Sequence, residues 1–531
     1  MGGLAIAAAI VAFGFLGSRV LGMVRQVAIA HAFGASPELD AYWVAFRVPD
    51  LIFQLLAGAT LGSAFIPVFA RLYRRESAER AWRLASAVLN TVTVATAAAC
   101  AVAFVLAPVL VPLLAPGLGE DIGRRDELID KAVLLTRIML LSPFLFAISG
   151  MVTGILNARQ QFFLPALAPM LYNIAIIFGA LVLAGPWGVE GLAVGVVIGS
   201  GLHLAVQVPG LVRERMRYQF VFDWAAAPTR EVARLMGPRL FGLAAAQANF
   251  FITTTYFASR VGTGVVSNLT YAWFIMNLPV ALFGMAFSTA VFPRLAELVA
   301  EDDLDGMTAT VSRVLRSIMF LTVPSALGLA ILAEPVTRVL LERGEFTAAD
   351  TGVVAAALFF YCIGVVPMAG IEIHSRGFYA LGDTRTPVAL TVAGMLVNLV
   401  LAALLWDRFE HKGLAFALSA ATWVEWALLA WLYGKRTATG ISDDLGAIAR
   451  FAFCAAVMTL FLAVARSAVD AGGQAAAFVT TVALVVAGAL VYVSAAWAMA
   501  LPELHDAFDR ARSLLGRPPA AGPGGTGLAG A

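Results

Sequence analysis

The sequence predicts an all-α polytopic membrane protein with about 14 transmembrane helices, arranged as two pseudo-symmetric six-helix lobes followed by two C-terminal helices. Three observations lead to this fold class: the composition, the spacing of the apolar segments and a weak internal repeat. Of the 531 residues, 60% are hydrophobic and only 13% are charged, and the mean hydropathy is +0.86. Soluble domains carry about 45–50% apolar and about 25% charged residues. Most of this chain must therefore face lipid.

Charge and motif content exclude several function classes. The formal net charge is +2, which argues against a nucleic-acid-binding protein that depends on a strong positive field. Cys100, Cys362 and Cys454 lie inside apolar segments without metal-ligand spacing, so we expect small core residues and no metal or redox site. The sequence contains no Gly-rich phosphate loop or nucleophile motif. We expect neither an enzyme nor a bound cofactor.

Fourteen apolar segments are long enough to cross a bilayer, whose core of about 30 Å needs about 20 apolar residues per helix. No basic residue precedes the first segment, which favours a retained helix over a signal peptide. Internal prolines and glycines, such as Pro49, Pro279 and Gly284, predict kinks in the longer segments. The predicted segments are 4–32, 38–70, 84–114, 131–156, 162–184, 189–212, 232–259, 264–293, 312–333, 348–375, 386–406, 413–434, 447–466 and 474–500.

The distribution of Lys and Arg predicts the orientation of the chain. The loops after the even-numbered segments, with the C-terminal tail, hold 22 of these residues, and the opposite loops hold nine. Cytoplasmic loops keep the excess of positive charge. Both termini are therefore predicted to be cytoplasmic.

The internal repeat has an offset of 222 to 226 residues. Pro67 matches Pro293, Pro165 matches Pro387, and Gly191-Leu192-Ala193 matches Gly413-Leu414-Ala415. In transporters built from parallel repeats the substrate site lies between the halves. An old duplication without moving parts is the alternative. The predicted domains are an N-lobe at 1–222, a C-lobe at 223–440, a helix pair at 441–502 and a disordered cytoplasmic tail at 503–531.

Two arginines of the first segment are the leading candidates for ligand contacts. A charge at the bilayer centre costs about 2.5–3.5 kcal/mol, so such residues normally face a cavity or a partner. Arg19 and Arg25 are separated by about 9 Å of helical rise and about 120° of rotation. A kink near Gly17 or Gly22 would bring both to one cavity, with Ser18 beside them. The alternative is that they extend to the membrane interface.

Arg47, in the second segment, is a third candidate. It lies seven residues after Asp40 and three before Asp50, so an ion pair with either acid is the alternative to a cavity role. Guanidinium groups suit bidentate phosphate or pyrophosphate ligands. The arginines together predict an anionic, phosphate-bearing cargo.

Polar side chains of the later segments provide weaker candidates. Amides are as often contacts between helices as ligand contacts. The polar cavity candidates are Gln247, Asn249, Asn268 and Asn277. The candidate carriers of protons or sodium are Glu372, Glu425 and His203, each with structural pairing as the alternative.

Several motifs resemble the MurJ/MviN family, the lipid II flippases of the MOP exporter superfamily. They occur in family order across segments 1 to 12. They include SRVLGMVRQVAIAHAFGAS (18–36), LDAYWVAFRVPDLI (39–52), GILNARQQFFLPALAPMLYN (154–173), ERGEFTAAD (342–350) and RGFYALGDTRTPV (376–388).

The resemblance implies a flippase of the bacterial inner membrane that serves peptidoglycan biosynthesis and cell shape. It would move an undecaprenyl-pyrophosphate-linked precursor, lipid II, to the outer leaflet by alternating access, alongside the cell-wall synthesis machinery. Segments 13 and 14 would hold the polyprenyl tail. Arg19 and Arg25 match arginines that contact the pyrophosphate, and Asp40 matches an acidic residue at the start of the second helix.

The chain departs from the family pattern at several cavity positions. Phe53, Gly58 and Phe274 stand where the resemblance implies charged residues. Thr253 stands where some members have the acid of a sodium site, although Asn398 keeps the amide expected there. Coupling to Na⁺, coupling to H⁺ and the membrane potential all stay open as energy sources.

Two other functions stay open from the sequence. One is a related MOP exporter of another lipid-linked glycan, or of a drug or cation. The other is a membrane scaffold that transports nothing.

Overall fold

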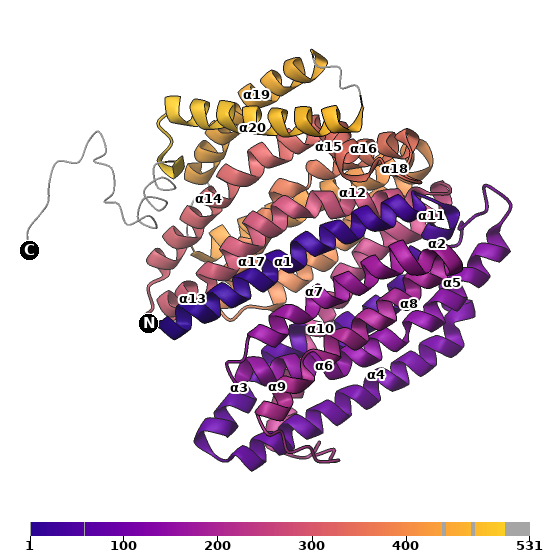
Figure 1. Ribbon diagram of the computed structural model, residues 1–531. Helices are drawn as coiled ribbons and strands as arrows, with labels where there is room; N and C mark the ends of the chain where they lie inside the picture. Colours follow the sequence, from indigo (N-terminus) through magenta and orange to yellow (C-terminus); the bar gives the residue numbers. More distant parts are fainter. Residues whose placement is uncertain (1, 58, 438–441, 469–472, 505–531) are drawn as a thin grey trace, which may run out of the picture. The chain divides into compact units, whose positions relative to one another are not determined.

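The described part of the chain is made of helices and their connecting loops. The computed structural model (Figure 1) describes residues 2–504 apart from residues 58, 438–441 and 469–472, and no strand occurs among these residues. The predicted all-α class is confirmed. The predicted tail at 503–531 lies almost entirely outside the described residues, and so does Gly58.

The helices and π-helical segments follow one another in this order: α1 (Gly2–Phe33), α2 (Pro37–Ile52), η1 (Phe53–Ala57), α3 (Ala59–Arg75), α4 (Ala78–Leu114), α5 (Arg125–Met139), α6 (Leu141–Ala158), α7 (Phe163–Phe178), η2 (Gly179–Leu183), α8 (Ala184–Ala205), α9 (Val208–Arg213), α10 (Ala227–Phe251), η3 (Ile252–Phe257), α11 (Ala258–Val261), α12 (Val265–Pro279), η4 (Val280–Met285), α13 (Ala286–Ala300), α14 (Leu304–Ile331), α15 (Ala333–Leu341), α16 (Ala348–Cys362), α17 (Val365–Ala380), α18 (Arg385–Thr437), α19 (Ser442–Ser467) and α20 (Gln474–Ala498).

Many of these helices are apolar enough to cross a membrane. Among the described residues, eight continuous helical stretches meet the length and hydropathy expected of a span, and a ninth is the pair α16 and α17, bent by 44°. Two of the eight, at 163–213 and 385–437, are 51 and 53 residues long, which is enough for two crossings each. The exact count of 14 spans stays a prediction.

Each of these two long stretches turns back on itself at one residue. Gly188 has φ 57° and ψ −138°, and Glu410 has φ 49° and ψ −137°. A Cβ on Gly191 or on Gly413 would meet the carbonyl oxygen eight residues earlier in the chain. The two corners therefore have the same geometry at an offset of 222 residues, which is also the offset between Gly191-Leu192-Ala193 and Gly413-Leu414-Ala415.

Two of the four π-helical segments in the described part of the chain, η1 and η4, follow predicted kink sites. η1 begins four residues after Pro49, and η4 begins directly after Pro279 and contains Gly284. Proline removes a backbone donor from the helical ladder, and π-helical turns are a common way to absorb such a break. The regular α-helical ladder is thus interrupted close to both predicted kink sites.

By contact density the described chain forms two compact units that interleave along the sequence. The first contains 1–275, 340–361 and 384–421, and the second contains 276–339, 362–383 and the residues from 422 onward. The division into lobes at residues 222 and 440 stays a prediction.

Small residues bring helices together in the first unit. A Cβ on Gly14 of α1 would collide with Ala166 of α7, and one on Gly179 would meet the backbone of Gly195 in α8. Such residues let helices approach closely in membranes, where no hydrophobic drive pulls one apolar surface onto another. This packing fixes α1, which carries Arg19 and Arg25, against α7.

In the second unit, α19 and α20 lie side by side (Figure 1). Gly488 of α20 packs against Leu462 of α19, and the Tyr492 hydroxyl donates to the carbonyl oxygen of Phe320 at 2.8 Å. These helices correspond to predicted segments 13 and 14.

Cys100, Cys362 and Cys454 are free and buried, as expected of small core residues.

Candidate functional site

Two cavities lie within the first unit and share one arginine. The larger, of about 860 Å³, is lined by parts of α1, α3, α6, α7 and α12, and we call it the arginine cavity. The residues of its lining that matter here are Ser18, Arg19, Arg25, Tyr172, Asn173 and Phe274.

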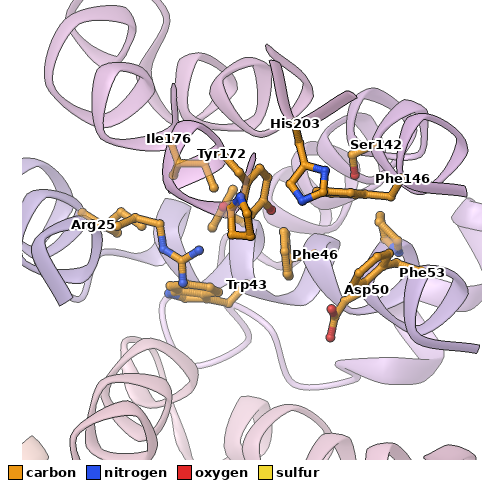
Figure 2. Close-up of a pocket in the computed structure, with 14 residues that line it drawn as sticks. Arg25, Trp43, Phe46, Asp50, Phe53, Ser142, Phe146, Tyr172, Ile176 and His203 are labelled. Atoms are coloured by element: carbon orange, nitrogen blue, oxygen red, sulfur yellow. The ribbon is translucent and has the colours of Figure 1, made fainter. Parts of the chain in front are cut away.

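The smaller cavity, of about 390 Å³, has mostly ring side chains in its wall, and we call it the aromatic cavity. Its lining includes Arg25, Trp43, Phe46, Asp50, Phe53, Phe146, Tyr172 and His203. Figure 2 shows the guanidinium of Arg25 near Trp43 on one side and the carboxylate of Asp50 on the other, with aromatic rings between them. The two opposite charges are therefore held apart across an apolar space.

Arg19 and Arg25 both line the arginine cavity. Both side chains are partly buried. The Arg19 guanidinium lies 5.1 Å from the ring centre of Phe15. The Nε of Arg25 is buried and has no hydrogen-bond partner among the described residues. A buried donor without a partner is unusual in proteins and points to a ligand or water that completes it.

Asp50 is held by two amides. Its Oδ2 accepts from Gln54 Nε2 at 2.9 Å and from Gln247 Nε2 at 3.3 Å. Gln247, predicted as a polar cavity residue, therefore acts on the aromatic cavity through Asp50. The neutral amides orient the carboxylate without cancelling its charge.

Arg47 lines neither of these cavities. Its side chain is 4% exposed, and its Nε donates to Thr255 Oγ1 at 2.9 Å while Nη2 reaches Thr254 and Thr270 at 3.3 and 3.4 Å. The guanidinium also lies 4.7 Å from the ring centre of Phe250. Hydroxyl groups and ring faces thus contact this cation, and no direct ion pair joins it to Asp40 or Asp50 among the described residues. These are structural contacts, and the role of Arg47 at a substrate site stays a prediction.

Asp40 is also away from both cavities. It is 1% exposed and accepts hydrogen bonds from the backbone N–H groups of Gly264 at 2.5 Å and Ser267 at 2.8 Å, and from the Ser267 hydroxyl at 2.6 Å. These groups lie at the start of α12, where the helix dipole favours a negative charge. Asp40 therefore ties the start of α2 to the start of α12.

Asn249 and Asn398 belong to one buried amide cluster. The Asn398 Nδ2 donates to Asn249 Oδ1 and to Thr253 Oγ1, both at 2.6 Å. Thr253 is the residue at the position where the resemblance implies an acid. The three side chains are neutral, and the Oδ1 of Asn398 is buried without a hydrogen-bond partner among the described residues.

His203 belongs to a polar network that borders the aromatic cavity. Its Nδ1 lies 2.6 Å from Ser149 Oγ, and Gln207 Nε2 donates to the same oxygen at 2.8 Å. The Gln207 Oε1 accepts from Thr153 at 2.8 Å. The hydrogen bonds of this network fix the orientation of the His203 ring.

The remaining candidates lie in the second unit. Glu372 and Arg376 of α17 approach to 3.9 Å, which matches the structural alternative for Glu372. Glu425 of α18 is 8% exposed, and Asn277 is on α12. Within the described ranges, no group of three or more His, Cys, Asp or Glu could hold a metal ion.

Two of the positions at which the chain departs from the family pattern, Phe53 and Phe274, lie at the cavities. Phe274 lines the arginine cavity, and Phe53 lines the aromatic cavity, with its ring centre 4.8 Å from that of Phe146. Rings thus occupy places where the resemblance implies cations.

The aromatic wall was not predicted from the sequence. Trp43, Phe46 and Tyr172 carry no signal of their own in a chain with 55 aromatic residues among Phe, Trp and Tyr. For Asp50 the signal was present, because a carboxylate within a span normally has a functional or structural partner.

Comparisons with known proteins agree with this architecture. The family model described as "Lipid II flippase MurJ" matches residues 29–494. The chain belongs to the MurJ family. The lipid II flippase MurJ of Burkholderia cenocepacia is 33% identical over 418 residues, which cover 78% of this chain and 80% of that protein. The probable lipid II flippase MurJ of Vibrio cholerae is 29% identical over 460 residues, covering 83% and 85%.

Solved structures show the same fold. A structure titled "Lipid II flippase MurJ, inward closed conformation" superposes with a TM-score of 0.77 at 24% identity and covers 92% of this chain and 98% of that one. An inward-facing multidrug resistance MATE transporter of the MOP superfamily gives a TM-score of 0.67 at 15% identity, covering 79% and 94%. The fold is therefore that of MurJ and of the wider MOP superfamily.

Proposed function

We propose that this MurJ-family chain is a lipid II flippase. It moves the undecaprenyl-pyrophosphate-linked peptidoglycan precursor from the inner to the outer leaflet by alternating access. The observation that carries the proposal is the pair Arg19 and Arg25 at one cavity, with the buried Nε of Arg25 left without a described partner. Family membership supports the same cargo.

The chemistry of the arginine cavity suits a diphosphate. A guanidinium presents a planar set of donors that matches two phosphate oxygens at once. Each hydrogen bond to a charged group contributes about 1.5–3 kcal/mol. Two such groups at a partly open cavity would hold a diphosphate while the sugar and peptide parts of the cargo stay in the wider space.

The proposal includes a location and a domain plan. The chain lies in the bacterial inner membrane with both termini cytoplasmic, as the Lys and Arg excess predicts. The lobes are 1–222 and 223–440, and α19 and α20, within 441–502, hold the polyprenyl tail. Association with the cell-wall synthesis machinery belongs to the same proposal.

We infer that the membrane potential, rather than Na⁺ or H⁺ binding, drives the cycle. The cluster of Asn249, Thr253 and Asn398 contains no carboxylate of its own. Glu372 has Arg376 within 3.9 Å. The cations at the arginine cavity are therefore the groups on which a membrane potential would act.

The decisive experiment is cross-linking to a photoactivatable lipid II analogue in a strain depleted of its own flippase. The wild-type chain should restore surface labelling of lipid II and give adducts on α1 near Arg19 and Arg25. The variant Arg19→Ala/Arg25→Ala should lose both signals. The matched control, Arg74→Ala/Arg75→Ala, removes two exposed arginines at the end of α3 and should keep both.

Retained labelling in the Arg19→Ala/Arg25→Ala variant would refute the diphosphate site. Failure of the wild-type chain to restore any lipid II at the surface would instead favour the scaffold alternative.

A specific observation favours a second candidate, an exporter of another lipid-linked glycan. Phe53 and Phe274 reduce the positive charge of the two cavities relative to what the family pattern implies. A cargo with a less anionic headgroup would fit such a site. Efficient cross-linking to a lipid-linked glycan with a single phosphate, with none to lipid II, would select this candidate.

A further inference from the structure

The segment between α9 and α10 carries an alternating row of aromatic side chains. Tyr218, Phe220, Phe222 and Trp224 are spaced two residues apart, and the first, second and fourth are 56%, 79% and 62% exposed. The ring centres of Phe220 and Phe222 are 5.3 Å apart, and those of Phe222 and Trp224 are 6.1 Å apart. We call these four residues the aromatic stripe. Three of the four rings of the aromatic stripe are therefore more than half exposed.

The stripe is fixed to α4 by hydrogen bonds along its length. The backbone N–H of Gln219 donates to Ser86 Oγ at 3.1 Å, and the Asn90 side chain donates to the carbonyl oxygens of Gln219 and Val221. The indole N–H of Trp224 donates to Thr91 Oγ1 at 2.7 Å. The Tyr218 hydroxyl also donates to Asn90 Oδ1 at 2.9 Å, so the polar ends of the first and last rings are fixed to α4 while much of the ring surface stays exposed.

The exposed side chains of α4 define how deep the stripe lies in the bilayer. Large apolar side chains are exposed from Val94 to Leu113, which is 20 residues or about 30 Å of helix, the thickness of the hydrocarbon core. Thr91 lies one turn before this stretch, and Ser86 lies about 12 Å before it. Trp224 thus lies at the edge of the hydrocarbon, where Trp is enriched, and the other end of the stripe reaches into the headgroup layer.

Three arginines precede the stripe on the headgroup side. Arg213, Arg215 and Arg217 are exposed, and none of their side chains makes a hydrogen bond or ion pair with a described residue. The one acid among them, Glu214, is paired with Arg159 at 2.6 Å. This stretch therefore presents three uncompensated guanidinium groups at the level of the lipid phosphates, on the side that the Lys and Arg excess marks as cytoplasmic.

We propose that the aromatic stripe and these three arginines form a binding site for anionic phospholipid headgroups of the cytoplasmic leaflet. The rings insert at the boundary of the acyl chains while the guanidinium groups bind the phosphates. The site is separate from both cavities and independent of the transported cargo. It anchors the connection between α9 and α10 to the membrane surface.

The test uses Trp224 as a depth probe in the full-length protein reconstituted in phosphatidylcholine nanodiscs. The nanodiscs contain either brominated phosphatidylglycerol or brominated phosphatidylcholine at the same mole fraction, and bromine quenches tryptophan fluorescence. The fluorescence of Trp224 is obtained as the difference between the wild-type protein and Trp224→Phe. We expect quenching by both lipids, at least about two-fold stronger with the anionic one. Arg215→Gln/Arg217→Gln should remove that preference, and the charge-matched control Arg74→Gln/Arg75→Gln should keep it.

Three outcomes would overturn the proposal. Equal quenching by the two lipids in the wild-type protein would show no headgroup selection. Absence of quenching would show that the stripe does not reach the acyl chains. An equal loss of preference in the control variant would show a general effect of net charge. None of these depends on whether lipid II is the cargo.

Discussion

Two arginines on successive helices, Arg25 on α1 and Arg47 on α2, illustrate how differently one residue type is used in this protein. Arg47 is almost fully buried, yet three threonine hydroxyls and the ring of Phe250 satisfy it. Arg25 is more exposed, yet its Nε is buried without a described partner. The first arrangement is typical of a structural residue and the second of a residue that waits for a ligand.

This contrast gives a prediction that separates stability from transport. Arg47→Ala should lower the melting temperature of the purified protein, because it leaves buried threonine hydroxyls without their donor, at a cost of about 1–3 kcal/mol for each unsatisfied group. Arg25→Ala should leave the melting temperature unchanged or raise it, since it removes a charge that the protein itself does not satisfy, while it abolishes lipid II flipping. Thermal unfolding followed by tryptophan fluorescence, together with the labelling assay, measures both effects. A large loss of thermal stability in Arg25→Ala would show that it is a structural residue.

At the scale of elements, the corners within the two long helical stretches share one backbone conformation, but only the first corner has the residue type that this conformation favours. Gly188 and Glu410 have nearly the same backbone angles, at φ values of 57° and 49°. These angles correspond to the first central position of a type II′ turn, which strongly favours glycine. The first corner has the favoured residue, and the second has a glutamate whose side chain is 66% exposed.

Glu410→Gly should therefore stabilise the protein. Positive φ costs a residue with a Cβ roughly 1–2 kcal/mol, and the only ion pair of Glu410 among the described residues is a 3.9 Å contact with His411. The expected result is a higher melting temperature with flipping unchanged. Glu410→Gln serves as the control, because it removes the charge and keeps the strain. An equal rise in both variants would attribute the effect to charge.

The glycines that follow each corner, Gly191 and Gly413, should tolerate substitution by alanine less well than a glycine with free space around it. An alanine at Gly191 or Gly413 would press its Cβ against a backbone carbonyl, which can move only with its helix. We expect each substitution to destabilise the protein by roughly 1–3 kcal/mol, as overpacking does. Gly185→Ala is the matched control, since a Cβ there meets nothing within 4 Å. Equal melting temperatures for Gly191→Ala and Gly185→Ala would contradict the close approach.

At the scale of the whole molecule, the sequence predicts what depends on local pattern and misses what depends on long-range pairing. Apolar runs predict the helices, Pro49 and Pro279 precede two π-helical segments, and charge within a span marks Arg19 and Arg25 as cavity candidates. The partners of Arg47 lie 207 to 223 residues away, and Ser267 lies 227 residues from Asp40. Which faces of such distant helices meet is set by packing, and helical periodicity contains no information about it. The wall of the aromatic cavity was missed for the same reason.

The balance of charge at the cavities leads to a prediction about energy. Arg19, Arg25 and Asp50 give one net positive charge there when no cargo is bound. A membrane potential acts on each charge with about 2.3 kcal/mol per 100 mV across the full field. With the cytoplasm negative, it draws the empty, cationic site inward and drives the anionic cargo outward, so both halves of the cycle are favoured. Collapsing the potential with valinomycin at equal K⁺ concentrations should therefore slow flipping in proteoliposomes several-fold, and replacing Na⁺ with choline should leave the rate unchanged. If choline stopped flipping while the potential was held, the arginines would not be the coupling element, and the neutral cluster around Asn398 would have to bind the driving ion.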